Sequence, residues 1–351
     1  MTKESKSSYR IIGGMAGSSM DGLDLVEVVF FQEQGEWSFE VLKSETFLYD
    51  EEIFNLLKSA KNAPKEDQNK LDEIFGRWIA ERVKNFGCEK AELIAVHGHT
   101  LIHKPDQGIS WQLGRGDVIA NLTKRKALTN FRTKDVLLGG QGAPLVPVGD
   151  FELFKKFDAC LNLGGIANVS IQSSMLAWDV CPCNQILNHF ANKLGKPFDS
   201  GGKMASRGEM VPSWYEKIAA IAYFHLPPPK SLPNEFIDDH LLEEINAVDG
   251  LKTYTQFIRN QLMSDLSSHL TAGSQVLITG GGALNTYLID ILNRNDHQFE
   301  FLVPEEVLVH FKEAIIFAFL GLLRVLDKPN VLASVTGASQ NSCSGEIHFP
   351  E

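Results

Sequence analysis

Apolar residues recur at helical spacing in some segments of the chain and form short unbroken runs in others. The helical spacing predicts a helix at 51–60 and a long one at 68–86. In the second, one stripe consists of Leu71, Ile74, Phe75, Trp78, Ile79 and Val83. Further helices are predicted at 117–126, from Asn184 as the N-cap to about 194, within about 238–270, at 286–293 and at about 304–326.

The short apolar runs predict buried strands at 93–96, 110–113, 127–131, 175–180 and 275–279. Because strands and helices are mixed along the chain, the pattern indicates an α/β protein. A polar loop rich in glycine at 138–145 is typical of a flexible connection, and we expect a junction between two halves there.

One pattern of strand, glycine-rich turn and strand occurs twice. The first copy is 11–24, followed by an apolar run from Leu25 to Phe30, and the second is 160–171. Glycine has no side chain and tolerates positive φ, so such a turn can bring backbone amides close to a ligand. A strand follows each turn, whereas the P-loop and the dinucleotide fingerprint require a helix there. The repeat predicts two related halves that close on one nucleotide.

Composition and charge exclude several classes of protein. The chain has 351 residues, is 44% hydrophobic and 22% charged, and has room for two domains. Its net charge of −11 argues against a nucleic-acid surface, which would normally be basic. The amino terminus is polar, and the longest apolar stretch, 314–323, is about half the length that a membrane span needs. We expect a cytoplasmic protein with no membrane segment and no nucleic-acid partner.

Cysteine and histidine pairs offer weak signals for metal binding. Five cysteines are too few for a disulfide scaffold, and Cys181-Pro182-Cys183 lacks the spacing of zinc or thioredoxin motifs. A plain turn is favoured there over a metal or redox role. His97 and His99 could form a zinc pair, but no third ligand is near in the sequence. Hydrogen bonding to a sugar or phosphate, or packing of the turn, is the favoured interpretation.

The glycine-rich turns carry groups that suit a nucleotide. In the first hairpin, amides and hydroxyls suit phosphate oxygens and carboxylates suit Mg²⁺; the residues are Ser18, Ser19, Asp21, Gly22 and Asp24. In the second, Gly164, Gly165 and Asn168 could contact the same phosphates. A third turn, Gly280, Gly281 and Gly282, opens a helix at its positive dipole end. A single glycine more often only makes a turn, but three such turns together favour nucleotide binding.

Three charged residues stand at positions suited to chemistry. Asp179 ends an apolar strand just before a turn, where a carboxylate can act as general base or nucleophile; the alternative is a capping role. Glu313 begins the most apolar helix, where burial of a charge needs a reason, although a place near the helix N-terminal half is also favourable. Arg132 ends a strand and could hold a phosphate or sugar oxygen with two hydrogen bonds.

These residues lie in motifs that resemble those of the anhydro-N-acetylmuramic acid kinase family nearly end to end. Residues 15–24 resemble its M-S-G-T-S-x-D-G-x-D opening, and 97–100 resemble its H-G-Q-T. The stretch 131–147 is similar to its F-R-x-x-D and G-G-Q-G-A-P-L-V-P motifs, and 162–168 to its N-x-G-G-I-A-N. Matching segments also occur at 228–231, 280–285, 312–314 and 334–338.

The resemblance implies a fold and an activity. The family belongs to the sugar kinase, actin and Hsp70 ATPase superfamily, so we expect two related actin-like ATPase (ribonuclease H-like) domains with a nucleotide cleft between them. The first would be 1–148, completed by 327–351, and the second 149–326. The implied enzyme uses ATP and Mg²⁺ to hydrolyse the 1,6-anhydro bond of anhydro-N-acetylmuramic acid and phosphorylate O6. The product is N-acetylmuramic acid 6-phosphate, in peptidoglycan recycling, and the family suggests a homodimer.

The resemblance also implies roles for single residues. Asp179 would be the base that activates water, while Arg132, Glu313, Thr100 and His97 would bind the sugar. The ATP phosphates would be bound by Gly17, Ser18, Ser19, Met20, Asp21, Gly22, Leu23, Asp24, Gly164, Gly165, Asn168, Gly280, Gly281 and Gly282. Asp21 could contact Mg²⁺, which ATP and water would mostly hold.

The chain departs from the family pattern at a few positions. Cys181 and Cys183 replace both glycines of D-x-G-P-G-N, His99 replaces a glutamine, and Ala16 a serine. Residues 232–235 lack the arginine of T-G-R-E. Two alternatives follow: a related kinase for another sugar, and a non-catalytic ATP-binding relative in which the turn at Cys181 and Cys183 blocks the sugar. A cysteine pair beside the base could also make the site sensitive to oxidation.

Overall fold

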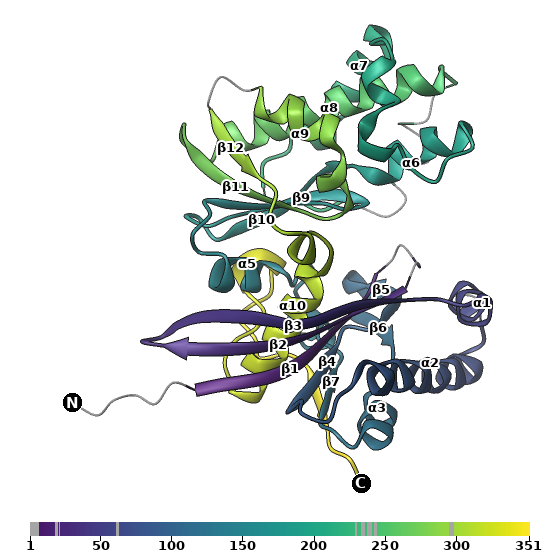
Figure 1. Cartoon of the computed structure of the whole chain (residues 1–351), viewed down its shortest axis with the longest axis vertical. Helices are drawn as coiled ribbons and strands as arrows, with labels where there is room; N and C mark the ends of the chain where they lie inside the picture. Colours follow the sequence, from purple (N-terminus) through teal and green to yellow (C-terminus); the bar gives the residue numbers. More distant parts are fainter. Residues whose placement is uncertain are drawn as a thin grey trace. The chain divides into compact units, whose positions relative to one another are not determined.

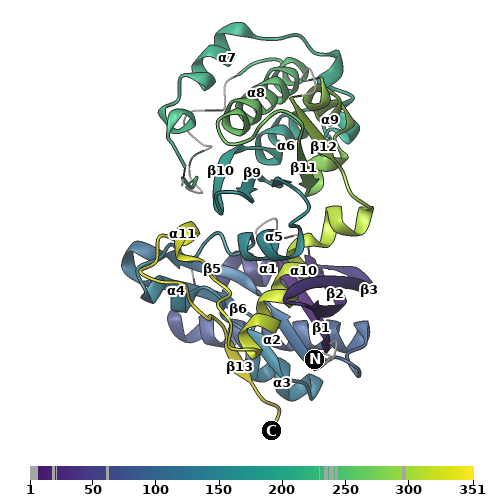
Figure 2. The ribbon, with the colours of Figure 1, turned by 90° about the vertical axis from the view of Figure 1, so that its left-hand side faces the viewer.

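The computed structural model describes residues 7–17, 20, 22–60, 63–228, 230–232, 236, 241, 244–294 and 298–351. Contacts between residues divide the chain into two compact units (Figure 1, Figure 2). Unit 1 consists of Met1–Leu153 and Phe311–Glu351, and unit 2 of Phe154–His310. These bounds are close to those of the expected domains, but the contacts assign residues 311–326 to unit 1. No helix in the described ranges is long and apolar enough to cross a membrane.

Unit 1 is built on a mixed sheet with the strand order β13-β7-β4-β1-β2-β3. Its strands are β1 (Ser7–Ala16), β2 (Gly22–Glu33), β3 (Glu36–Leu48), β4 (Leu93–Val96), β7 (Ala127–Thr129) and β13 (Glu346–His348). β1, β2 and β3 form an antiparallel meander, whereas β4 and then β7 lie parallel on the other side of β1. β13 pairs antiparallel with β7, and β5 (His99–Lys104) with β6 (Ile109–Leu113).

Helices cover both faces of this sheet. They are α1 (Glu51–Ala60), α2 (Lys65–Phe86), α3 (Gly116–Thr123), α4 (Thr133–Leu137), α5 (Pro147–Leu153), α10 (Glu306–Val325, which belongs to unit 1 from Phe311 on) and α11 (Ala333–Thr336), with a 3₁₀ turn at Pro105–Gln107. Ile12 packs in one cluster with Phe75 and Ile79 of α2. α10 approaches the opposite face so closely that a Cβ on Gly13 would collide with the backbone of Ala314. Because successive residues of a strand face opposite sides, this helix requires glycine at position 13.

Unit 2 is built on a sheet with the order β10-β9-β8-β11-β12. Its strands are β8 (Ala159–Leu163), β9 (Ile166–Ile171), β10 (Leu176–Pro182), β11 (Ser274–Thr279) and β12 (Phe299–Leu302). Its helices are α6 (Asn184–Lys193), α7 (Pro212–Ala219), α8 (Ala247–Ser267) and α9 (Thr286–Asn293). Short 3₁₀ turns lie at Ser200–Gly202, Ala205–Arg207, Ala222–His225 and Gly281–Leu284. The buried aromatic residues Trp178, Phe190, Trp214, Tyr254 and Phe257 belong to the core of this unit.

The two sheets repeat one plan. In unit 2, β8, β9 and β10 form an antiparallel meander, and β11 and then β12 lie parallel on the other side of β8. These strands correspond in order and direction to β1, β2, β3, β4 and β7 of unit 1. The predicted α/β class with two related halves is confirmed, and the hairpins β1–β2 and β8–β9 occupy equivalent places in it.

Most predicted elements are present, and the differences have local causes. α3 ends at Thr123, since Lys124 adopts φ 56°, and β7 ends at Thr129. The sequence did not predict β3, whose thirteen residues are largely exposed or half-buried. Asn184 is not the N-cap of α6. The cap is Cys183, and the carbonyls of Gly164 and Gly165 accept hydrogen bonds from the first amides at this end of the helix.

The loop at 138–145 lies inside unit 1 and differs from the flexible junction that we expected. The amide of Gly142 donates to Oδ2 of Asp135 at 2.8 Å, and the amide of Gln141 donates to the carbonyl of Thr336 at 2.8 Å. Oδ1 of Asp135 accepts from the hydroxyl of Thr336 at 2.7 Å. The fully buried Asp135 therefore ties this loop to α11, and glycine content alone gave no sign of it.

Candidate functional site

Arg132 is held in unit 1 by two neutral acceptors. Its Nε donates to Nε2 of His97 at 2.9 Å, and its Nη1 donates to the carbonyl of Gly142 at 2.6 Å. Burial lowers the pKa of Arg132 to about 10, against the opposite effect of the Glu313 carboxylate. A guanidinium has five N–H donors, so donors remain beyond these two bonds for the oxygen of a ligand.

His97 fixes the orientation of Arg132 as a neutral imidazole. Its Nδ1 donates to the carbonyl of Gly98 at 2.8 Å, which leaves Nε2 as the acceptor for Arg132. Burial, and then the charge of Arg132, holds the pKa of His97 well below its ordinary value. The ring packs against Phe317 of α10, with 4.6 Å between centroids. His97 thus acts as a hydrogen-bond acceptor for the guanidinium.

The alternative of a zinc pair at His97 and His99 finds no further ligands in the part of the chain that the structure describes. No group of three or more His, Cys, Asp or Glu side chains there could hold a metal ion. His99 and Thr100 begin β5, with Thr100 half-buried opposite Gln112 of β6. Thr100 thus lies three residues after His97, at the start of the strand that follows the turn.

Glu313 lies on α10 among several charged groups of unit 1. Burial raises the pKa of Glu313, while Lys312 and Arg132 lower it and Asp24 and Asp150 raise it. Nζ of Lys312 lies 2.8 Å from Oδ1 of Asp150, and both side chains are buried. Unit 1 thus brings Glu313, Arg132 and Asp24, which are far apart in sequence, within electrostatic range of one another.

The first hairpin turn is described only in part. Of the predicted phosphate ligands in it, Ser18, Ser19 and Asp21 lie outside the described residues, and so does the predicted magnesium contact of Asp21. The amide of Met20, at φ 56°, donates to the carbonyl of Gly17 at 3.4 Å. β2 then begins with Gly22, Leu23 and Asp24. Oδ1 of Asp24 accepts from the hydroxyl of Thr46 in β3 at 2.5 Å.

Asp179 is fixed on three sides in unit 2. Oδ2 accepts from the amide of Leu232 at 3.0 Å, its own amide donates to the carbonyl of Lys230 at 3.0 Å, and its carbonyl accepts from the hydroxyl of Tyr223 at 2.7 Å. Burial raises the pKa of Asp179 to about 6, although the amide of Leu232 lowers it. A carboxylate with a pKa just below neutral is suited to accept a proton as a general base.

Asp179 belongs to a row of polar residues across the sheet of unit 2. It pairs with Asn168 of β9, Asn168 pairs with Asn162 of β8, and Asn162 pairs with Thr279 of β11. Side chains of directly paired residues point to the same face of a sheet. The row therefore connects the predicted base with both predicted phosphate-binding turns of this unit, since Gly164 lies two residues after Asn162 and Gly280 directly follows Thr279.

The second hairpin turn, the turn at 280–282 and the start of α6 meet in unit 2. Nδ2 of Asn184 donates to the carbonyl of Leu163 at 2.9 Å. Gly280 adopts φ 83°, and a Cβ on it would lie 2.5 Å from Oδ1 of Asn162. A Cβ on Gly281 would meet only Nδ2 of Asn184, at 3.7 Å. The backbone at Gly281 is therefore open to a ligand, whereas the backbone at Gly280 is closely packed.

Cys181 and Cys183 point into the core of unit 2. Both are free thiols with an exposed fraction of 0% and belong to its apolar cluster. Burial raises the pKa of Cys181 well above its ordinary value and that of Cys183 to about 12. Thiols that are buried and protonated react slowly with oxidants. The cysteines that replace the glycines of the family thus lie in the core, and the expectation that they stand next to a ligand finds no support within this unit.

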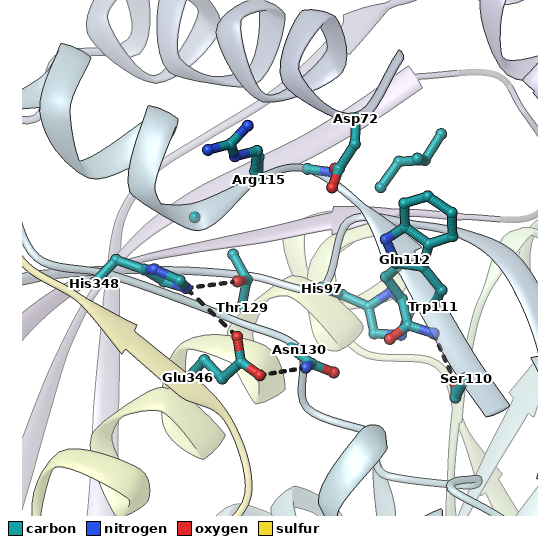
Figure 3. Close-up of a pocket in the computed structure, with 13 residues that line it drawn as sticks. Asp72, His97, Ser110, Trp111, Gln112, Arg115, Thr129, Asn130, Glu346 and His348 are labelled. Carbon is teal, nitrogen blue, oxygen red and sulfur yellow. Dashed lines mark hydrogen bonds and ion pairs between the residues drawn. The ribbon is translucent and has the colours of Figure 1, made fainter. Parts of the chain in front are cut away.

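A cavity of about 140 Å³ lies beside His97 in unit 1 (Figure 3). Its lining comes from α2, β6, α3, β7 and β13, and some of its polar side chains bond to one another. Asn130 Nδ2 donates to Glu346 at 2.7 Å, and Gln112 Nε2 donates to the hydroxyl of Ser110 at 2.9 Å. Of the predicted sugar-binding residues, His97 lines it and Arg132, Glu313 and Thr100 do not, so the cavity adjoins the Arg132 cluster through His97.

Sequence reasoning missed the residues that hold the predicted site in place. Asp135 and Lys230 stand inside the family motifs at 131–147 and 228–231, so these motifs contained a signal for them. Tyr223 and Asp265 lie outside every motif, and their partners became visible only in the folded chain.

Comparison with known proteins gives the family. A model of the family "Anhydro-N-acetylmuramic acid kinase" matches residues 9–350. The anhydro-N-acetylmuramic acid kinase of Picosynechococcus sp. is 32% identical over 379 residues, covering 97% of this chain and 100% of the relative. That of Synechocystis sp. is 32% identical over 392 residues, covering 96% and 98%.

Solved structures are similar at a lower level. The activator of the 2-hydroxyisocaproyl-CoA dehydratase from Clostridium difficile, with bound ADPNP, aligns with a TM-score of 0.44 and 14% identity over 91% of this chain and 97% of that one. The ROK hexokinase from Thermus thermophilus aligns with a TM-score of 0.39 and 11% identity over 89% and 99%.

Proposed function

The chain belongs to the anhydro-N-acetylmuramic acid kinase family, and from this premise we propose how its residues carry out the reaction of that family. It is an enzyme, an ATP-dependent kinase of amino-sugar metabolism in peptidoglycan recycling. It hydrolyses the 1,6-anhydro bond of anhydro-N-acetylmuramic acid and phosphorylates O6, giving N-acetylmuramic acid 6-phosphate.

Asp179 is the general base of this reaction in our proposal. The observation that carries it is a carboxylate with one oxygen held by the amide of Leu232 and a pKa raised by burial to about 6. A water molecule gives its proton to this carboxylate while its oxygen bonds to the anomeric carbon and the bond from that carbon to O6 breaks. O6 keeps the electron pair and takes the γ-phosphoryl group, and ADP leaves. An ionised carboxylate at neutral pH is what this proton transfer needs.

The sugar is bound in unit 1 by Arg132, Glu313 and Thr100, and His97 acts on the sugar through Arg132. Arg132 has donors beyond its bonds to His97 and Gly142, and a buried guanidinium suits the oxygen atoms of a sugar. Glu313, on α10, can accept from a sugar hydroxyl. Neutral His97 orients the guanidinium, because its single acceptor nitrogen is already used by Arg132.

The glycine-rich turns bind ATP. Gly281 exposes open backbone, and Oγ1 of Thr279 is buried without a hydrogen-bond partner in the described ranges, so a phosphate or water would satisfy it. The other proposed ATP ligands of unit 2 are Gly164, Gly165, Asn168, Gly280 and Gly282. Residues 17–24 of the first hairpin also bind the ATP phosphates. ATP supplies the phosphoryl group, and Mg²⁺, held mostly by ATP and water with Asp21 as a protein contact, reduces the charge of the phosphates.

Three further properties belong to this proposal. Both units are actin-like ATPase domains, the protein is a homodimer, and it acts in the cytoplasm. The family supports all three, and the repeated sheet plan supports the first. The burial of Cys181 and Cys183 favours the catalytic proposal over a non-catalytic relative with a blocked sugar site, since neither thiol is exposed.

An ADP-release assay with and without anhydro-N-acetylmuramic acid tests the proposal. We expect ADP only when the anhydro sugar is present. Asp179→Asn should abolish turnover and retain ATP binding, while Asp290→Asn, an exposed aspartate of the same unit, should behave as wild type. Faster turnover with another sugar of a panel would instead indicate a related kinase. Tight ATP binding without turnover on any sugar would indicate a non-catalytic relative.

A further inference from the structure

One short segment holds the predicted base of unit 2. The carbonyl of Lys230 accepts from the amide of Asp179, and the amide of Leu232 donates to Oδ2 of the same residue, both at 3.0 Å. The segment 230–232 therefore contacts Asp179 at its backbone amide and at its carboxylate. Of the two carboxylate oxygens, Oδ2 is the one that this segment engages.

The side chain of Lys230 anchors this segment in the interior. Lys230 has an exposed fraction of only 8%, and its Nζ lies 3.5 Å from Oδ2 of Asp265 on α8. Nζ also lies 5.2 Å from the centroid of the Tyr223 ring, and the hydroxyl of Tyr223 donates to the carbonyl of Asp179. The contacts of Lys230 and those of Asp179 thus share Tyr223.

Asp265 is itself fixed by two donors. Nε1 of Trp178, the residue before Asp179 in β10, donates to Oδ2 at 2.9 Å, and Nε2 of Gln261 donates to Oδ1 at 2.8 Å. A buried ion pair adds little net stability compared with apolar residues, but removing one partner leaves a buried charge without compensation. The ion pair between Lys230 and Asp265 is therefore better explained by its effect on the position of the segment 230–232 than by a contribution to the stability of the fold.

We propose that Lys230 is a positioning residue for Asp179: its buried ion pair with Asp265 holds the segment 230–232 so that the amide of Leu232 occupies one carboxylate oxygen and leaves the other for the water. This inference rests on the proposed function of Asp179 as the base. Neither Lys230 nor Asp265 contacts the reacting atoms in it.

Positioning can be separated from a direct effect of charge. Among the described residues, Tyr223 and Cys181 interact electrostatically with Asp179, and Lys230 and Asp265 interact in turn with Cys181. If the charges of Lys230 and Asp265 acted directly, removing the cation would raise the pKa of Asp179 and removing the anion would lower it. If they act by holding the segment, either removal loosens the amide of Leu232, which normally lowers that pKa, so both removals raise it.

The test compares Lys230→Met and Asp265→Asn with wild type in the ADP-release assay from pH 5 to pH 8.5. We expect kcat at neutral pH to fall about 10- to 100-fold in both variants, because a displaced base is that costly. The acid limb of the kcat profile should move to higher pH in both, by about one unit. KM for ATP should stay within about twofold. Lys217→Met, an exposed lysine of the same unit, is the matched control.

A second variant keeps the test decisive if the buried pair cannot be broken without unfolding. Leu232→Pro removes the amide hydrogen and leaves Lys230 and Asp265 in place, and it should give the same upward shift. An unmoved acid limb in Leu232→Pro, or opposite shifts in Lys230→Met and Asp265→Asn, overturns the inference. Failure of the proposed function looks different: wild type would release no ADP with the sugar, or Asp179→Asn would remain active.

Discussion

Arg132 and His97 are joined by a hydrogen bond of 2.9 Å in which the guanidinium donates from Nε and the imidazole accepts at Nε2. The bond requires the proton of the imidazole to be on Nδ1, where it is given to the carbonyl of Gly98. A protonated His97 could not accept from Arg132, and burial opposes that protonation. The chain therefore uses one neutral side chain to orient a buried cation.

His97→Leu should weaken sugar binding more than ATP binding. The substitution leaves Nε of Arg132 without its partner, and a hydrogen bond to a charged group is worth about 1.5–3 kcal/mol. We expect KM for the anhydro sugar to rise about 10-fold or more, with KM for ATP unchanged. Steady-state kinetics with each substrate varied measure both values. His225→Leu, at an exposed histidine, is the control, and an unchanged sugar KM in His97→Leu would show that Arg132 does not need this acceptor.

The rate should depend on the ionisation of Asp179. Because the pKa of Asp179 is raised to about 6 and the base must be ionised, kcat should fall as the pH decreases through about 6. At pH 5 about one tenth of the carboxylate would be ionised, which predicts a roughly 10-fold loss. ADP release at saturating substrates from pH 5 to pH 8 measures this limb. A limb near pH 4 would instead indicate that the base has the ordinary pKa of an aspartate.

Asp179→Asn should make the protein more stable at neutral pH. The pKa of Asp179 is raised above its ordinary 3.8 in the folded chain, so ionisation opposes folding above pH 6, and this cost disappears as the pH falls from about 6 to about 4. Asparagine has no such cost and can still accept from Leu232. We expect a gain on the order of 1–3 kcal/mol at pH 7.5 and almost none at pH 4. Thermal unfolding at both pH values checks this, and an equal gain at both would contradict it.

Gly280 and Gly281 should respond differently to alanine. At Gly280, φ is 83° and a Cβ would lie 2.5 Å from Oδ1 of Asn162, so Gly280→Ala should lower stability by about 1–3 kcal/mol. At Gly281 a Cβ meets only Nδ2 of Asn184 at 3.7 Å, so stability should be retained. The new methyl group would occupy the place proposed for ATP, so KM for ATP should rise several-fold. Calorimetry and ATP titration separate the two effects.

Cys181 and Cys183 should be unreactive in the folded protein. Both are fully buried, and their pKa values are raised, whereas Cys343 is partly exposed. A coloured disulfide reagent at pH 7.5 should modify Cys343 first, and Cys343→Ser should remove the fast phase. Cys181→Gly should cost about 1–3 kcal/mol of stability by leaving a cavity in the core. Rapid modification of Cys181 or Cys183 in the Cys343→Ser variant would contradict this prediction, because it would show that these thiols are accessible to the reagent.

The local spacing of apolar residues predicted much of the fold. The apolar stripe of α2 and the apolar runs of β4 and β11 were predicted because a helix or strand buries a face at its own period. β3 was not predicted, since it is exposed along much of its length and its pattern is weak. The cap of α6 was misplaced by one residue because carbonyls of a distant turn, Gly164 and Gly165, replace a side-chain cap.

The sequence by itself determined the class of fold, the repeated hairpins and the residues of each motif, because these depend on neighbours a few positions apart. The tertiary structure alone decided which groups meet: His97 with Arg132 across 35 positions, Leu232 with Asp179 across 53, and Lys312 with Asp150 across 162. It also decided where the cysteines point, since the pairing of β10 shifts between Asp179 and Cys181. Such a bulge breaks the alternation of faces along a strand, and packing of the whole unit fixes where it falls.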